Sequence, residues 1–294
     1  MKLKEFDLDK FEQRVVASPR ICIYCGITLP PEELTDEHVI PYALGHNTLI
    51  FEKSSCKQCA EIIQPYEQAV LRQQLGDFRL KVDAPSRTKK RNRPTTVTLP
   101  FVEIDGEGRL IRDLGTRTFP LAEAPLVLNL WTLPEAGIIR GDLDGSDLGG
   151  RPWSFVDHTR ADEINRQIAA ETGAIHVAMK VGEVNRDHFL RFLAKTAHAY
   201  ATADLGLDGF TPFLNDLILN RAHDLTKFVG GTLPLQRSAT NADTVLMSIG
   251  TARDLVAVLF QFYPSLKSPA YAIIVGAMNE HTEARLVALA EQYS

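Results

Sequence analysis

The chain has 294 residues, of which 45% are hydrophobic and 23% are charged. This is the composition of a globular protein with one large domain or two of medium size. The chain has no apolar run of the roughly 18 residues that a membrane-spanning helix requires. Its charged start lacks the apolar core of a signal peptide, and its net charge of −5 excludes a uniformly basic nucleic-acid-binding surface. We therefore expect a cytoplasmic location.

The first informative feature in chain order is a pair of CxxC motifs. They are Cys22 and Cys25 in ICIYCG, and Cys56 and Cys59 in SSCKQCA. A cytosolic chain keeps its thiols reduced, and each CxxC pair can hold one side of a tetrahedral ion. The segment 26–55 is longer than the gap in a compact zinc ribbon and leaves room for a β-hairpin. The spacing predicts structural zinc; a redox pair is the alternative, although no βαβ pattern surrounds either motif.

Two short strands and helical segments are predicted around these cysteines. TDEHVI and NTLIF are β-prone, and they flank PYALGH, in which Pro41 and Gly45 indicate a loop. From Cys56 onward, CKQCAEIIQ is typical of a helix. Pro65 is expected at the first position of a second helical stretch, PYEQAVLRQQL.

A basic segment follows, RLKVDAPSRTKKRNR over residues 79–93, with seven Lys or Arg and one Asp. Such a run is usually a solvated linker, here assigned to residues 81–94. The alternative is contact with nucleic-acid phosphates, because local positive charge can bind them whatever the net charge of the chain. The candidate contacts are Lys89, Lys90, Arg91 and Arg93.

The remainder of the chain, 95–294, is expected to form one mixed α+β domain with a largely antiparallel sheet. Its predicted role is targeting, regulation or assembly, including a possible homo-oligomer. Helices are predicted over 185–204, with Asn185 as the N-cap, and over 211–224. The predicted strands are rich in Val, Ile, Leu and aromatic residues. They are TTVTLPFVEI, LVLNLWTL, AIHVAMKV, TVLMSI, LVAVLFQF and AYAIIVGAM.

The predicted helix over 185–204 carries His188, Arg191, Lys195 and His198 at intervals that place them on one face. A basic stripe of this kind could follow a nucleic-acid backbone. The alternative is an amphipathic helix with this face in solvent.

Taken together, CIYCG, LTDEHVIPYALG and SSCKQCAEIIQPYEQAVLR resemble the zinc-knuckle branch of the HNH endonucleases, in particular a bacterial subfamily with an EHIIP strand. The resemblance covers roughly residues 20–75. It implies a ββα-metal fold in an N-terminal domain, 1–80, and an enzyme that hydrolyses DNA phosphodiester bonds.

The resemblance also implies roles for individual side chains. His38 would be the general base and Glu37 a ligand of one catalytic divalent ion, Mg²⁺ or Mn²⁺. Glu67 matches the acidic position of the family pattern and would be a second ligand; its alternative role is an acid in the first turn of a helix. Asn47 would be the middle Asn of the motif. The four cysteines would hold structural zinc.

Two features depart from the family pattern. Ala60 stands where the family carries Asn or His, so the usual side-chain ligand is missing. Asn47 lies further from Cys56 than the middle Asn does in the family. In addition, Glu37 and His38 point to opposite faces of a regular strand, so both can serve one phosphate only if the strand twists or bulges. The alternative function is a zinc-stabilised nucleic-acid-binding or interaction protein that has lost catalysis.

Overall fold

The computed structural model describes most of the chain. The described residues are 6–7, 13–44, 48–84, 86, 88–142, 149–234 and 245–292. None of the helices in these ranges has both the length and the apolar character needed to cross a membrane.

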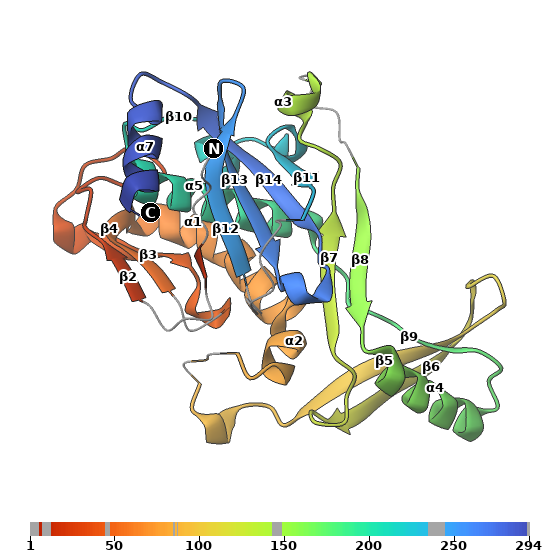
Figure 1. Ribbon diagram of the computed structural model, residues 1–294. Coiled ribbons are helices and arrows are strands. Elements are labelled where there is room, and N and C mark those ends of the chain that lie inside the picture. Colours follow the sequence, from red (N-terminus) through yellow and green to blue (C-terminus); the bar gives the residue numbers. More distant parts are fainter. Residues whose placement is uncertain are drawn as a thin grey trace.

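The N-terminal part is a ββα unit (Figure 1). β3 (Leu34–Ile40) pairs antiparallel with β4 (Thr48–Cys56), and α1 (Lys57–Gln68) follows directly. β2 (Gln13–Val16) adds a parallel strand on the other side of β4. Cys56 is the N-cap of α1, because its sulfur accepts a hydrogen bond from the N–H of Cys59. The predicted strand pair and helix are confirmed.

The expected helix start at Pro65 is wrong, since α1 continues through this residue. A π-helical turn, Ala69–Gln74, follows without a break, and α2 (Gly76–Lys81) comes next. Ile63 and Tyr66 on either side of Pro65 are both buried. Their packing outweighs the lost backbone hydrogen bond at proline, and the wider π turn begins within one turn of it.

A central antiparallel sheet holds most of the core (Figure 1). Its strands β12 (Val245–Ala252), β13 (Leu255–Phe262) and β14 (Ala270–Ala277) run in sequence as a meander, and nearly every residue in them is buried. These strands were predicted and are confirmed. Three short strands extend the sheet: β1 (Phe6–Asp7) on β12, and β10 (Thr211–Pro212) and β11 (Val229–Thr232) on β14.

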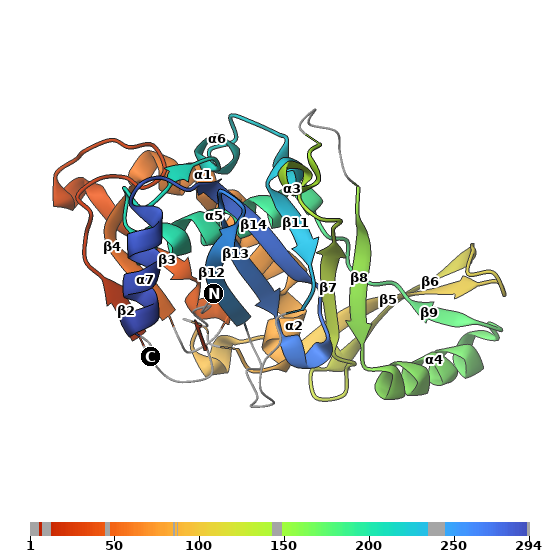
Figure 2. The same ribbon diagram turned by 45° about the horizontal axis from the view of Figure 1, so that its top comes forward.

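The longest helix, α5 (Arg186–Leu205), lies between this sheet and the ββα unit (Figure 2). It contacts β13 and β14 on one side and β3 and α1 on the other. Its predicted bounds are confirmed, with Asn185 as the N-cap and Gly206 just past its end. Because both sides are covered, Arg191, Lys195 and His198 are all buried. A basic stripe on the surface and a solvated polar face were therefore both wrong expectations.

The helix expected over 211–224 is wrong. Thr211 and Pro212 pair with β14 instead, and only one turn, α6 (Asn215–Ile218), is helical. The Arg191 guanidinium donates hydrogen bonds to the carbonyls of Leu217 and Ala222 beyond this turn. A buried cation thus adds to the backbone hydrogen bonds of this segment.

A separate lobe projects from the other end of the molecule and is joined to the sheet by an antiparallel ribbon (Figure 1). The ribbon consists of β7 (Val127–Thr132) and β8 (Arg151–Val156), with α3 (Gly137–Arg140) between them in the chain. The lobe elements are β5 (Thr96–Ile104), β6 (Leu110–Pro120), β9 (Val177–Met179) and α4 (His158–Thr172).

The last helix, α7 (Thr282–Gln292), follows β14 near the C-terminus. The predicted strands at 95–104, 126–133 and 174–181 are confirmed, whereas β6, β8, α4 and α7 were not expected.

The α+β class and the largely antiparallel sheets are confirmed. One hydrophobic cluster runs through the ββα unit, α5 and the central sheet, from Cys22 to Leu289. The division of the chain at 81–94 stays a prediction, but the core is continuous across it.

Candidate active site and metal centre

The first cysteine pair lies on a tight knuckle. The N–H of Gly26 donates to the carbonyl of Cys22, and the N–H of Cys22 donates to the carbonyl of Ile27, both at 2.9 Å. Gly26 has φ +73°, a conformation that favours glycine. The turn closes the backbone around the position where the Cys22 and Cys25 sulfurs converge.

The four cysteine sulfurs form one cluster, with all Sγ atoms within 4.8 Å of one another. The Cys25 and Cys56 sulfurs are 3.8 Å apart. Zn–S bonds of about 2.3 Å in a tetrahedron place sulfurs about 3.8 Å apart, so this spacing suits zinc. A hydrogen bond from the Cys59 thiol lowers the pKa of Cys22 to about 4, while the same interaction raises the pKa of Cys59. The cluster thus already favours a thiolate, the form that binds zinc.

Glu37 and His38 diverge from β3 in different directions. The register of β3 against β4 shifts between Thr35 and Glu37 and again between His38 and Ile40, so irregular pairing flanks the two residues on both sides. Glu37 is buried in the interior, whereas His38 is half-buried and lines a surface cavity. The strand irregularity that the sequence required is present, but it does not bring both side chains to the same cavity.

Glu37 instead meets Lys195 of α5. The Lys195 Nζ lies 2.5 Å from a carboxylate oxygen of Glu37 and 3.0 Å from one of Glu67, and it donates to the backbone carbonyl of His38 at 3.1 Å. The lysine side chain is 1% exposed. Burial alone would lower the pKa of Lys195, but its attraction to Glu37 and Glu67 outweighs burial and raises the pKa above the ordinary value. The three side chains form an ion triad, in which Lys195 and Glu37 are buried and Glu67 is partly exposed.

The cavity beside this triad has a volume of about 1030 Å³. Its lining combines His38 and the loop after β3, one face of α1 and the π-helical turn, α2, and the chain from Asp83 to Thr95, together with Leu121. Its basic and amide side chains are His38, Gln64, Gln68, Arg72, Arg79 and Arg93, and its carboxylates are Glu67, Asp77 and Asp83. The Nδ1 atom of His38 is buried and finds no hydrogen-bond partner within the described parts of the chain.

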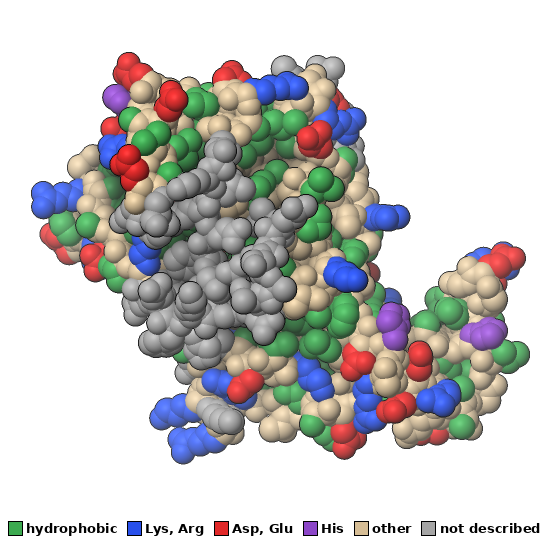
Figure 3. All heavy atoms as spheres, viewed as in Figure 1, with side chains coloured by type: hydrophobic (Ala, Val, Ile, Leu, Met, Phe, Trp, Pro, Cys, Tyr) green, Lys and Arg blue, Asp and Glu red, His purple; other side chains and the backbone are tan. Residues whose placement is uncertain are grey.

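The basic segment forms one wall of this cavity. Thr88, Arg93, Pro94 and Thr95 line it, and Lys89 and Arg91 are exposed alongside. Figure 3 shows Lys and Arg side chains projecting from the lower edge of the molecule, where the chain after α2 runs in Figure 1. The side chain of Lys90 lies outside the described residues.

Arg93 is held within the segment. Its guanidinium pairs with Asp83 at 3.0 Å and donates to the carbonyls of Thr88 and Ser86. Arg93 therefore shapes the wall, while Lys89 and Arg91 present their charge to solvent.

Two site residues were missed at the sequence level. Lys195 was interpreted as part of a basic stripe, and its contact with Glu37 and Glu67 was missed because these partners are 128 residues or more away along the chain. Arg72 lies in the predicted helical stretch, is exposed and lines the cavity; its position on the same helical run as Glu67 could have indicated it. Asn47 lies outside the described residues, and its role stays a prediction.

The described residues do not fit a divalent ion shared by Glu37 and Glu67. Their carboxylates already share the Lys195 ammonium, and Ala60 has no donor atom. In the part of the chain that the structure describes, the cysteines are the one group of three or more Cys, His, Asp or Glu side chains close enough to share an ion.

The family comparison agrees with the ββα unit. Residues 22–75 match a family model described as HNH endonuclease. The match spans both cysteine pairs, β3, β4 and α1, and it confirms the resemblance found in the motifs. The comparisons with curated proteins and with solved structures found no match.

Substitution of Cys25 tests the zinc centre, because this cysteine is exposed and contributes little to packing. We expect Cys25→Ser to lose bound zinc and to destabilise the ββα unit, since ligand binding contributes directly to folding in such sites. Elemental analysis and thermal unfolding measure both effects. Thr28→Ala, an exposed change on the same knuckle, should keep the zinc; full zinc content in Cys25→Ser would contradict the assignment.

Substitution of Lys195 tests the ion triad. We expect Lys195→Met to lower the free energy of unfolding by about 3–5 kcal/mol, because it leaves a buried carboxylate without its counter-charge. Lys57→Met is the matched control: its side chain is 84% exposed beside Glu61, and its loss should cost about 1 kcal/mol or less. Urea denaturation measures both. Equal costs for the two variants would show that the triad is not the constraint assigned here.

Proposed function

We propose that the chain is an HNH-type endonuclease that hydrolyses DNA phosphodiester bonds in the cavity lined by His38. The observation that carries the proposal is that one cavity is lined both by His38, on β3 of the matched ββα unit, and by Arg72, Arg79 and Arg93. A general base next to positive charge is the combination that phosphodiester hydrolysis requires.

His38 supplies the base in this proposal. Its neutral imidazole takes a proton from water as the water oxygen forms a bond to phosphorus, and the bond from phosphorus to the leaving oxygen breaks. The products are a phosphate monoester and an alcohol, whose oxygen is protonated by solvent or by the imidazolium. The hydrogen bond from Lys195 to the His38 carbonyl holds the strand that presents the imidazole.

Positive side chains supply the phosphate contacts. Arg72 is exposed and lines the cavity, and Lys89 and Arg91 are exposed in the same segment as the lining residues Thr88 and Arg93. Guanidinium and ammonium groups bind phosphate oxygens and stabilise the charge that develops on them. No step is assigned to a divalent ion, because Glu37 and Glu67 hold the Lys195 ammonium.

A second candidate is a nucleic-acid-binding protein that does not cleave. The engagement of Glu37 and Glu67 by Lys195, together with Ala60, favours it. It shares the DNA-binding cavity with the first candidate and differs in chemistry alone. Binding without nicking under every ion tested would select it.

Plasmid nicking tests the role of His38. In buffer with Mg²⁺ or Mn²⁺, we expect His38→Ala to lose about 100-fold or more of the nicking rate, which is the usual contribution of a general base. His281→Ala, an exposed histidine next to α7, is the matched control and should cleave at the wild-type rate. Equal nicking by wild type and His38→Ala would rule out His38 as the base.

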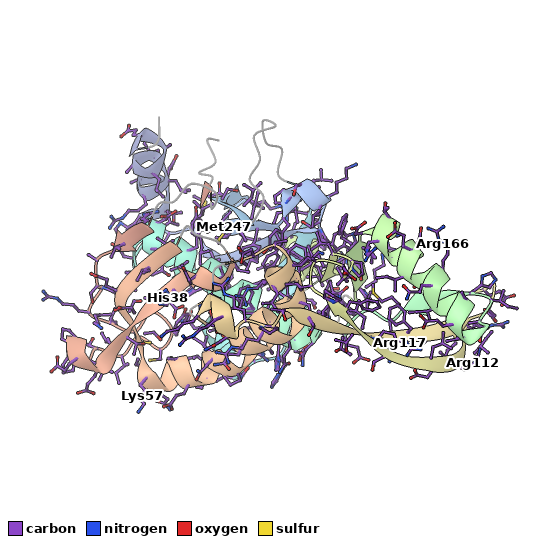
Figure 4. The ribbon with its side chains drawn as sticks, turned by 90° about the horizontal axis from the view of Figure 1, so that it is seen from below. His38, Lys57, Arg112, Arg117, Arg166 and Met247 are labelled. Carbon is purple, nitrogen blue, oxygen red and sulfur yellow. The ribbon has the colours of Figure 1, made fainter. Side chains whose placement is uncertain are left out.

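Salt dependence tests the basic segment. Lys89→Ala/Arg91→Ala should weaken DNA binding and reduce the slope of log affinity against log salt by about 0.9 for each phosphate that the variant no longer neutralises. Arg117→Ala/Arg166→Ala removes the same charge from the projecting lobe, at the opposite end of the molecule from His38 (Figure 4). Fluorescence anisotropy at several salt concentrations measures the slopes. A larger change in the lobe variant would place the DNA elsewhere.

A further inference from the structure

Lys195 comes from a part of the chain beyond the HNH match, which ends at residue 75. It lies near the middle of α5, and its Nζ is within 3.1 Å of Glu37, Glu67 and the His38 carbonyl. Glu37 and Glu67 are the two carboxylates to which the family resemblance gives the catalytic ion. Their shared partner is therefore a cation, but it is an ammonium of the protein.

An ion cannot join this arrangement while the lysine stays. Mg²⁺ takes carboxylate oxygens at about 2.1 Å, so an ion bridging Glu37 and Glu67 would need the space that Nζ holds between them. Two cations in one buried position would also repel each other strongly.

The lysine is enclosed by the packing of α5. Its neighbours on α5, Ala194 and Thr196, are fully buried, and the side chain itself is 1% exposed. α5 is covered by the sheet on one side and by β3 and α1 on the other. Releasing the ammonium would leave a charge buried without partners, which proteins avoid.

Two buried phenols, those of Tyr24 and Tyr66, lie near Glu37 and Glu67. Burial, followed by repulsion from Glu37, raises the pKa of both phenols, so they stay neutral. Lys195 is the positive side chain within ion-pair distance of both acids in the described residues.

We propose that Lys195 is the resident cation of this site, and that Glu37 and Glu67 hold its ammonium in place of a divalent ion. The inference rests on the proposed function only for the identity of the site. It identifies the cation that Glu37 and Glu67 bind, and it holds whether or not a phosphodiester bond is cleaved beside them.

Mn²⁺ binding to the zinc-loaded full chain tests this, with electron paramagnetic resonance as the readout. The wild type should bind no Mn²⁺ that depends on Glu67, so Glu67→Gln, a change at a partly exposed residue, should leave its binding curve unchanged. Lys195→Ala vacates the position and removes the repulsion between two cations, so it should raise Mn²⁺ affinity by about tenfold or more. The double variant Lys195→Ala/Glu67→Gln should lose that gain, and Lys57→Ala is the control for removing a lysine elsewhere.

Binding by the wild type that disappears in Glu67→Gln would overturn the inference, as would a folded Lys195→Ala that gains no Mn²⁺. If Lys195→Ala does not fold, the comparison of wild type with Glu67→Gln decides alone. Nicking assays separate this result from the proposed function. If the wild type neither cleaves DNA nor binds Mn²⁺ through Glu67, the endonuclease proposal is wrong and the assignment of Lys195 stands. If the wild type does both, the assignment of Lys195 is wrong and the endonuclease proposal stands.

Discussion

The buried ammonium of Lys195 is the constraint on which the arrangement of the site depends. A charge in a dry interior has to be paired at short range. Three groups pair with it: the Glu37 carboxylate on β3, the backbone carbonyl of His38 on the same strand, and the Glu67 carboxylate on α1. Since the lysine is fixed on α5 and α5 is packed on the central sheet, these contacts determine where the strand that carries His38 lies relative to the rest of the molecule.

The ββα unit is therefore held in place by two separate sets of contacts. The cysteine cluster joins the knuckle to β4 and α1 within the unit, and α5 holds it from outside. The Nε2 atom of His198 is hydrogen-bonded to the carbonyl of Ile23 at 2.9 Å, and the side-chain amide of Asn215 donates to the carbonyl of Tyr24 at 2.8 Å. The knuckle is therefore packed against the C-terminal part of the chain. Burial lowers the pKa of His198, which keeps this imidazole neutral in the core. The C-terminal part completes the site as well as extending the chain.

Local patterns predicted the elements that local physics determines. The CxxC spacing indicated the metal cluster because its ligands meet through one hairpin, and Asn185 and Gly206 marked the ends of α5 because caps act within one turn. Long-range contacts decided the rest. The basic residues of α5 were interpreted as a surface face because their partners are distant in sequence. The helix predicted over 211–224 did not form; Thr211 and Pro212 pair with β14, and Arg191 binds the carbonyls of Leu217 and Ala222. Glu37 was predicted to bind a divalent ion, whereas in the structure it pairs with the Lys195 ammonium, a partner too distant in sequence to be predicted.

Ala60 and Lys195 are best understood together. An amide at position 60 is useful only if an ion lies between the acids to receive its oxygen, and with the ammonium there a further neutral ligand has nothing to bind. A lysine in the core, in turn, is tolerable only where two carboxylates already converge. The missing side-chain ligand at position 60 and the buried ammonium of Lys195 thus have one explanation. Glu37 and Glu67 of the ββα unit bind Lys195 and so attach α5 to the site. Any chemistry at His38 then draws its positive charge from the arginines that line the cavity, of which Arg72 is exposed.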